Sequence, residues 1–328
     1  MPTIEDLRYM QKLPLDIKIA MTKLRISKFI NRYGSECYVS FSGGKDSTVL
    51  LHIARQLYPN LSAVFVNTGL EYPEIQAFVR SHDNITVITP QYRFTDIISE
   101  YGYPVIGKEI ARAVHYARQG SSWAIDKLTG KKKNADGTKS KYNYTKYEPL
   151  LHTDFDVAEH CCYFLKKRPA HNVKMKCKYS IIGTLAEESH LRTQRWLKTG
   201  CNSYSGNIKS RPMSFWTEQD ILEYIRQYNL PIASVYGDIV TDRNTNELCT
   251  TGCNRTGCIY CGFGCHLEQG ETRFQKLAKT HPRHYEYCLG GGEYTAQGKW
   301  QPNHSGLGLA HVFDTLNDIY GKDFIRYE

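Results

Sequence analysis

The pattern of apolar and polar residues along the chain predicts strands separated by helices. Short apolar runs predict strands at 37–41, 62–67, 85–89 and 179–183. Helical spacing of apolar residues predicts helices at 4–33, 48–58 and 218–228. Strands that alternate with helices favour a parallel sheet covered on both faces. The expected fold class is therefore α/β, with a Rossmann-like parallel sheet.

The pattern changes near residue 240, where Gly, Cys, Thr and Asn become frequent and periodicity fades. We therefore expect three regions: a helical segment at 1–33, a nucleotide-binding domain at 34–240 and a Cys-rich, metal-binding region at 241–328. The chain of 328 residues is 41% hydrophobic and 23% charged. This composition excludes a disordered or collagen-like chain. No apolar run is long enough to span a membrane, so we expect no membrane partner. The N-terminal residues lack an apolar signal core, which favours the cytoplasm.

The net charge of +9 is concentrated in one segment, residues 127–146, which is rich in lysine and holds a single acid, Asp136. One interpretation is a solvated, mobile insertion in the nucleotide-binding domain. The other is contact with a polyanion, since lysines neutralise phosphates and tyrosines stack on bases. A nucleic acid is the partner that the second interpretation implies.

Cysteines provide the second chemical signal. The chain has 11 Cys, and five of them lie between Cys249 and Cys265, while Cys161 and Cys162 are adjacent. In a reducing compartment such clusters indicate a metal site rather than disulfides. The spacing of Cys258 and Cys261 suits a tetrahedral zinc ion as well as an iron–sulfur cluster.

A glycine turn, SGGKDS at Ser42–Ser47, follows the first predicted strand and precedes a predicted helix. Glycines allow close approach of a ligand to the backbone, and N–H groups at the start of a helix bind phosphate. Lys45 adds a positive charge. The turn lacks the first glycine of the Walker A pattern.

Four ordered segments carry a family resemblance: FSGGKDS at 41–47, VNTGLEYPE at 66–74, GTLAEESHLR at 183–192 and RPMSFWTEQDILEYIRQYNLPIASVY at 211–236. The first resembles the PP-loop of the ATP pyrophosphatase superfamily. Together they resemble the phosphoadenosine phosphosulfate (PAPS) reductase family. The resemblance implies the fold of the adenine nucleotide alpha hydrolases and a site for ATP or a sulfonucleotide. The matching nucleotide-binding residues are Ser42, Gly43, Gly44, Lys45, Asp46, Ser47, Asn67, Thr68, Gly69, Gly183, Glu188, Ser189 and Arg192.

Two positions depart from the family pattern. Asn67 stands where the family usually has aspartate, and Leu185 where it usually has arginine. Both are expected near the nucleotide, so the 3′ group or sulfate is handled differently. Arg192 and Arg195 remain as candidate anion ligands.

The resemblance extends to a branch of the family that carries a [4Fe–4S] cluster on a Cys-Cys pair and a later C-x-x-C. It implies Cys161, Cys162, Cys258 and Cys261 as cluster ligands. Zinc is the alternative metal. Cys249, Cys253 and Cys265 remain as further candidates, either for the ligand set or as thiols that carry sulfur.

Sulfonucleotide reductases of the family end in a tail of E-C-G-x-H type, whereas this sequence shows no cysteine after Cys288. We therefore expect an ATP-dependent sulfurtransferase, which resembles the cluster-bearing ATP pyrophosphatase of DNA phosphorothioation. Its partners are expected to be ATP, Mg²⁺, a nucleic-acid acceptor and a cysteine desulfurase or thiol donor. Lys45, Asp46 and Cys265 are the candidate catalytic residues. The alternatives are a reductase with Cys265 or Cys288 as nucleophile, and a nucleotide-binding regulatory or DNA-defence component with a structural metal.

Overall fold

The computed structural model describes residues 2–172 and 178–328, which group into two compact units. Unit 1 comprises residues 1–67, 71–89 and 172–257, and unit 2 comprises 68–70, 90–171 and 258–328. Residues 90–171 thus pack with the C-terminal residues. These units differ from the predicted boundary near residue 240, because composition along the chain does not report packing between distant segments. No helix in the described ranges is long and apolar enough to cross a membrane.

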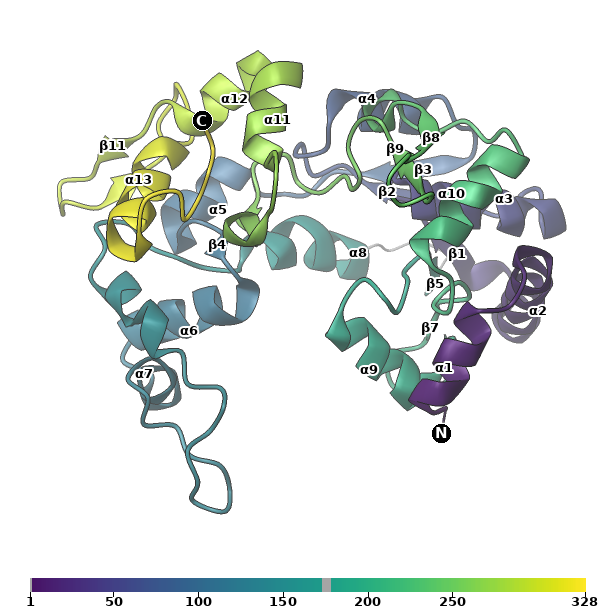
Figure 1. The fold of residues 1–328 in the computed structure, drawn as a ribbon, viewed down its shortest axis with the longest axis horizontal. Coiled ribbons are helices and arrows are strands. Elements are labelled where there is room, and N and C mark those ends of the chain that lie inside the picture. Colours follow the sequence, from purple (N-terminus) through teal and green to yellow (C-terminus); the bar gives the residue numbers. More distant parts are fainter. Residues whose placement is uncertain (1, 173–177) are drawn as a thin grey trace. The chain divides into compact units, whose positions relative to one another are not determined.

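Unit 1 is built on a six-stranded sheet in the order β3-β2-β1-β5-β7-β6 (Figure 1). All neighbouring strands are parallel except β6 and β7. The strands are β1 (Cys37–Ser40), β2 (Ala63–Val66), β3 (Ile85–Ile88), β5 (Tyr179–Ile182), β6 (Asn202–Ser203) and β7 (Lys209–Ser210). Val39 and Ile181 pair in the middle of the sheet and are fully buried. The predicted α/β class with a parallel sheet is confirmed.

In the described residues of unit 1, this sheet is accompanied by the helices α1 (Ile4–Gln11), α2 (Leu15–Tyr33), α3 (Lys45–Leu57), α4 (Pro73–Arg80), α9 (His190–Thr199) and α10 (Glu218–Gln227). A hairpin of β8 (Ile239–Thr241) and β9 (Leu248–Thr250) follows. Residues 4–33, predicted to be helical, form two helices, α1 and α2, with a break at residues 12–14. Pro14 lacks a backbone N–H and fixes its own φ, so the chain stops at Gln11 and starts a new helix at Leu15.

Unit 2 is mainly helical. Its helices are α5 (Phe94–Tyr101), α6 (Lys108–Arg118), α7 (Ser122–Leu128), α8 (Arg168–Asn172), α11 (Arg273–Thr280), α12 (Pro282–Leu289) and α13 (Leu309–Tyr320). Short strands pair β4 (Val105–Ile106) with β10 (Gly262–Phe263), and β11 (Glu293–Tyr294) with β12 (Trp300–Gln301). Phe155, Phe274 and Phe313 form part of its core. The β4–β10 pair joins two segments that are far apart in the sequence.

Candidate nucleotide and cysteine sites

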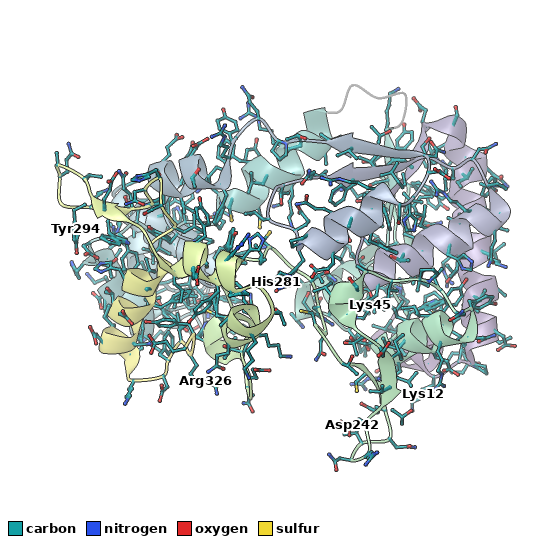
Figure 2. All side chains as sticks on the ribbon, turned by 90° about the horizontal axis from the view of Figure 1, so that it is seen from above. Lys12, Lys45, Asp242, His281, Tyr294 and Arg326 are labelled. Atoms are coloured by element: carbon teal, nitrogen blue, oxygen red, sulfur yellow. The ribbon has the colours of Figure 1, made fainter. Side chains whose placement is uncertain are left out.

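The loop Ser42–Ser47 joins β1 to α3, and α3 begins at Lys45, labelled in Figure 2. Gly43 has a φ of +72°, and a Cβ there would lie 2.8 Å from the side chains of Ile75 and Val79. The Ser42 N–H donates to Ser47 Oγ at 3.2 Å, and Ser47 Oγ donates to the Gly44 carbonyl at 2.9 Å. Hydrogen bonds within the loop therefore stabilise its conformation. The loop leads into the N-terminus of α3, where the partial positive charge of the helix favours binding of an anion.

Lys45 is buried, with a side chain held by residues from much later in the sequence. Its Nζ lies 2.9 Å from Glu218 Oε1 and donates to the Asn254 carbonyl at 2.6 Å. Its backbone N–H donates to the Tyr236 hydroxyl at 3.3 Å. None of these three partners was predicted, although Glu218 and Tyr236 lie in the segment that resembles the family. The positive charge of Lys45 is therefore compensated by the Glu218 carboxylate.

Asp46 follows Lys45 in the first turn of α3. Burial raises the pKa of its carboxyl group, and the Lys45 ammonium opposes that shift. Gly183, directly after β5, packs on this turn, and a Cβ at that position would lie 2.9 Å from the Asp46 carbonyl oxygen. The structure therefore brings the predicted residue Gly183 against the predicted loop, and a larger residue at 183 would displace the start of α3.

The predicted residues Glu188, Ser189 and Arg192 lie at the start of α9. Ser189 is the N-cap, with its Oγ accepting from the Arg192 N–H at 3.3 Å. The Glu188 carboxylate accepts the Leu185 N–H at 2.8 Å and forms an ion pair with Arg192. Leu185 itself is buried, in the place where the family usually has arginine.

Arg255 connects these groups to Lys45. Its guanidinium lies 3.7 Å from both Glu188 and Glu218. Lys45, Arg192 and Arg255 thus share two carboxylates beside the loop of unit 1. A phosphate chain that displaced those carboxylates would meet three cations, which is the electrostatic requirement of a nucleotide polyphosphate.

A second group of cations lies on α9 and β7. Burial lowers the pKa of Lys209 and of Arg211, and the neighbouring positive charge of Arg195 adds to both shifts. Arg195 and Arg192 repel each other as well. In residues 2–172 and 178–328, no ion pair involves Arg195, Lys209 or Arg211. Uncompensated charges of this kind favour the binding of an anion.

The segment after β2 holds the remaining predicted nucleotide residues. The Asn67 N–H donates to the Ile88 carbonyl at 2.8 Å, which extends the pairing of β2 with β3. Thr68 Oγ1 accepts the Leu70 N–H at 3.2 Å, and Gly69 has a φ of +74°. Asn67 belongs to unit 1, whereas Thr68 and Gly69 belong to unit 2. Their role toward a nucleotide stays a prediction.

The four predicted cluster cysteines all lie in unit 2. Cys161 and Cys162 precede a π-helical turn, Tyr163–Lys167, and Cys258 and Cys261 form a turn closed by a 3.1 Å hydrogen bond from the Cys261 N–H to the Cys258 carbonyl. A hydrogen bond with the Cys161 thiol lowers the pKa of Cys162, as do the ammonium groups of Lys108 and Lys166. Burial raises the pKa of Cys258 and Cys261, and the charge of Cys162 adds to both shifts. The structure therefore brings the four thiols within electrostatic range of one another.

The donor set of these thiols suits an iron–sulfur cluster. Within the described residues, no three His, Cys, Asp or Glu side chains converge closely enough to hold a single metal ion. Four thiolates are the number that a cuboidal iron–sulfur cluster needs, and a tetrahedral zinc ion takes the same number. Lys108, Lys166 and Arg273 surround them with positive charge, which compensates the negative charge of thiolate ligands.

The backbone next to this site is strained. Ile106, in β4, has a φ of +64° although it is β-branched and buried. Its carbonyl accepts the Gly264 N–H at 2.8 Å, and β4 pairs with β10, which directly follows Cys261. Lys108 comes two residues after Ile106. Such strain is often found at functional sites.

The additional cysteines have different surroundings. The Cys265 thiol donates to the Gly262 carbonyl at 2.9 Å, and burial raises its pKa to about 12. Burial also raises the pKa of Cys288, which is fully buried. A raised pKa disfavours the nucleophilic thiolate form of both residues. The catalytic role considered for Cys265 and Cys288 stays a prediction. Cys249 and Cys253 belong to unit 1, whereas the four predicted cluster cysteines belong to unit 2.

The sequence of the chain matches a known protein family. The family model described as phosphoadenosine phosphosulfate reductase domain matches residues 36–104 and 127–263. The chain belongs to the PAPS reductase family. The matched ranges contain the loop Ser42–Ser47, the start of α9 and the four cysteines of unit 2. Family membership therefore covers both candidate sites.

Two sulfonucleotide reductases and one solved structure illustrate how similar known proteins are to the chain. A phosphoadenosine 5′-phosphosulfate reductase of Photobacterium profundum is 24% identical over 228 residues, covering 70% of this chain and 74% of the relative. An adenosine 5′-phosphosulfate reductase of Staphylococcus haemolyticus is 22% identical over 204 residues, covering 62% and 66%. The crystal structure of a PAPS reductase from Candida auris, a phosphate complex, covers 75% of this chain and 98% of its own at 13% identity, with a TM-score of 0.39.

Proposed function

We propose that the chain is an ATP-dependent sulfurtransferase of the PAPS reductase family. The observation that carries the proposal is the sharing of two carboxylates among Lys45, Arg192 and Arg255 beside the loop Ser42–Ser47. Three cations at a helix N-terminus are suited to a triphosphate, and the carboxylates keep them compensated until it binds.

ATP binding would exchange Glu218 and Glu188 for phosphate oxygens. The backbone of the loop and Lys45 would hold the β- and γ-phosphates, with Arg192 and Arg255 as additional anion ligands. Asp46 would stand beside the Mg²⁺ that accompanies ATP. An oxygen of the acceptor then attacks the α-phosphorus and pyrophosphate leaves. A persulfide sulfur from a cysteine desulfurase would attack the acceptor atom that bears the adenylated oxygen, so that the bond to sulfur forms as the bond to oxygen breaks and AMP leaves with the oxygen. A thiol donor would then cleave the remaining S–S bond, which leaves the sulfur on the acceptor and a disulfide as the oxidised product.

We propose further that Cys161, Cys162, Cys258 and Cys261 hold a [4Fe–4S] cluster. The cluster would supply redox chemistry and iron-bound sulfide in unit 2. Among the chain's own residues, Lys108, Lys166 and Arg273 would neutralise the negative charge of the ligated thiolates. The low pKa of Cys162 favours its thiolate form, which is the form that binds metal.

A second function, sulfonucleotide reduction with release of sulfite, is favoured by the similarity to PAPS and APS reductases. Arg195, Lys209 and Arg211, which form no ion pair within the part of the chain that the structure describes, would suit an additional anionic group of a sulfonucleotide. Reduction by a nucleophilic cysteine needs a thiolate, and burial raises the pKa of Cys265 and Cys288, which disfavours that form. We therefore place ATP-dependent sulfur transfer first.

Two assays on anaerobically purified protein separate the functions. Pyrophosphate release from ATP, abolished in Lys45→Ala and retained in the control Lys23→Ala, would support sulfur transfer. Sulfite release from APS or PAPS with a thiol donor would support reduction and contradict the first proposal. Tight nucleotide binding with neither product would contradict both, and would leave a nucleotide-binding component without turnover.

A further inference from the structure

The lysine-rich segment after α7 forms a hairpin, residues 131–143, which extends from α6 and α7 of unit 2 (Figure 1). Asn143 holds its two arms together. Its Oδ1 accepts the Lys132 N–H at 3.0 Å, and its Nδ2 donates to the carbonyls of Lys132 and Ser140 at 3.0 and 2.7 Å. The Asn134 N–H donates to the Thr138 carbonyl at 2.8 Å across the turn. These hydrogen bonds therefore hold the backbone of the two arms side by side.

Like charges face each other across this hairpin. Lys133 and Lys139 form an antiparallel bridge, so their side chains are direct cross-strand neighbours. Like charges in such positions are destabilising. In the described parts of the chain no ion pair involves Lys131, Lys133, Lys139 or Lys141, and all four are exposed. The arrangement costs stability in the free protein and becomes favourable when an anion lies across the two arms.

The one acid of the hairpin does not relieve this charge. Asp136 Oδ1 accepts from the backbone N–H and the hydroxyl of Thr138, at 2.9 and 2.6 Å. Its carboxylate is thus committed to the turn. Lys127, before the hairpin, contrasts with the exposed lysines because it is paired with Glu109 at 2.9 Å. Lys127 is therefore compensated by a carboxylate, whereas the four exposed lysines of the hairpin form no ion pair within the described residues.

An aromatic ring lies among the lysines. Tyr142 is 46% exposed, and the ammonium groups of Lys132 and Lys141 lie 5.6 and 5.3 Å from its ring centroid. Exposed aromatic rings beside cations form stacking platforms for nucleobases. The turn, Asn134 to Gly137, carries an acid and no large apolar side chain, which disfavours insertion into a lipid surface.

We propose that the hairpin docks on the phosphate backbone of a nucleic acid without reading its sequence. Lys131, Lys133, Lys139 and Lys141 would neutralise phosphates, and Tyr142 would stack on an unpaired base. Lysine contacts to phosphate fix position but carry no sequence information. This proposal goes beyond the proposed function and does not depend on it, because docking needs neither ATP nor a cluster.

The test measures binding of the full chain to fluorescein-labelled duplex DNA of about 20 base pairs, without nucleotide, over a salt series. The same sequence as single-stranded DNA and as RNA distinguishes the form of nucleic acid. The variant K131Q/K133Q/K139Q/K141Q removes the four exposed lysines. The control K12Q/K28Q/K198Q/K322Q removes equal charge from exposed lysines elsewhere, and K131R/K133R/K139R/K141R keeps the hairpin charge.

The proposal expects the first variant to lower the slope of log K against log salt by about 3 to 4 for duplex DNA, since each phosphate contact contributes about 0.9. The control and the arginine variant should change the slope by less than about 1. Equal losses in the hairpin variant and the control would show that only net charge matters, and would overturn the proposal. Absence of binding by the wild type, or binding to phosphatidylserine vesicles but not to nucleic acid, would also overturn it.

Discussion

The ammonium group of Lys45 lies 2.9 Å from the carboxylate of Glu218, although the two residues are far apart in the sequence. Each begins a helix, α3 and α10, and Arg255 approaches the same carboxylate at 3.7 Å. The Glu218 carboxylate therefore compensates the positive charges of Lys45 and Arg255. Several consequences can be measured.

Glu218→Gln should bind ATP more tightly than the wild type. The substitution removes the carboxylate that competes with phosphate for Lys45 while keeping the size of the side chain. A gain of roughly fivefold, equivalent to about 1 kcal/mol, is expected for a partly exposed pair. Titration calorimetry checks it, with Glu223→Gln, an exposed residue on the same helix, as the control. Weaker binding by Glu218→Gln would show that Glu218 takes part in the nucleotide site itself.

Gly183→Ala should disturb the loop without touching any charged group. The added Cβ would lie 2.9 Å from the Asp46 carbonyl oxygen, so the start of α3 must shift. We expect a loss of about 1–3 kcal/mol in the free energy of unfolding, together with weaker ATP binding. Urea denaturation and calorimetry measure both. Gly257→Ala is the matched control because a Cβ there meets open space. An unchanged free energy of unfolding in Gly183→Ala would contradict the packing.

Asp46→Asn should change how stability depends on pH. Burial raises the folded-state pKa of Asp46 above its unfolded value near 3.8. The folded protein therefore binds this proton more tightly, and stability is lost as pH rises from that unfolded pKa through the folded pKa. The variant avoids that loss, so its stability relative to wild type should increase between about pH 4 and pH 7. Urea denaturation across this range, with the exposed Asp16→Asn as control, measures it. A constant difference between variant and wild type would contradict the shift.

Substitution of Cys162 or Cys258 by serine should lower iron and acid-labile sulfide together. We expect about four of each per chain in the wild type and less than about half in either variant. Cys265→Ala and Cys288→Ala should keep the metal content, because their buried thiols lie outside the proposed ligand set. Elemental analysis and the visible spectrum of anaerobic protein decide it. One zinc per chain without sulfide would contradict the cluster, and metal loss in Cys265→Ala would place that residue among the ligands.

Local patterns predicted β1, β2, β3 and β5 and the position of the loop Ser42–Ser47, because apolar runs and a glycine turn are properties of neighbouring residues. The sequence pattern did not predict β6 and β7, which are two residues long. Pro14 could have indicated the break between α1 and α2, because proline interrupts a helix. The helical spacing of apolar residues on both sides of Pro14 instead favoured a single helical segment. The partners of Lys45 could not be predicted in this way. Asn254 contributes a backbone carbonyl and Tyr236 a hydroxyl from distant segments, and only packing shows that they meet the loop.

The strained backbone of Ile106 couples two properties of unit 2. A left-handed β-branched residue costs of order 1–3 kcal/mol and persists only while its surroundings hold it. Those surroundings are the pairing of β4 with β10 and the hydrogen bond from Gly264, both of which follow directly from the Cys258–Cys261 turn. Loosening of that turn would let Ile106 relax and move Lys108 with it. If the four cysteines hold the proposed cluster, its loss and local opening of the chain would be a single cooperative event, and the resistance of this segment to proteolysis would report whether the cluster is bound.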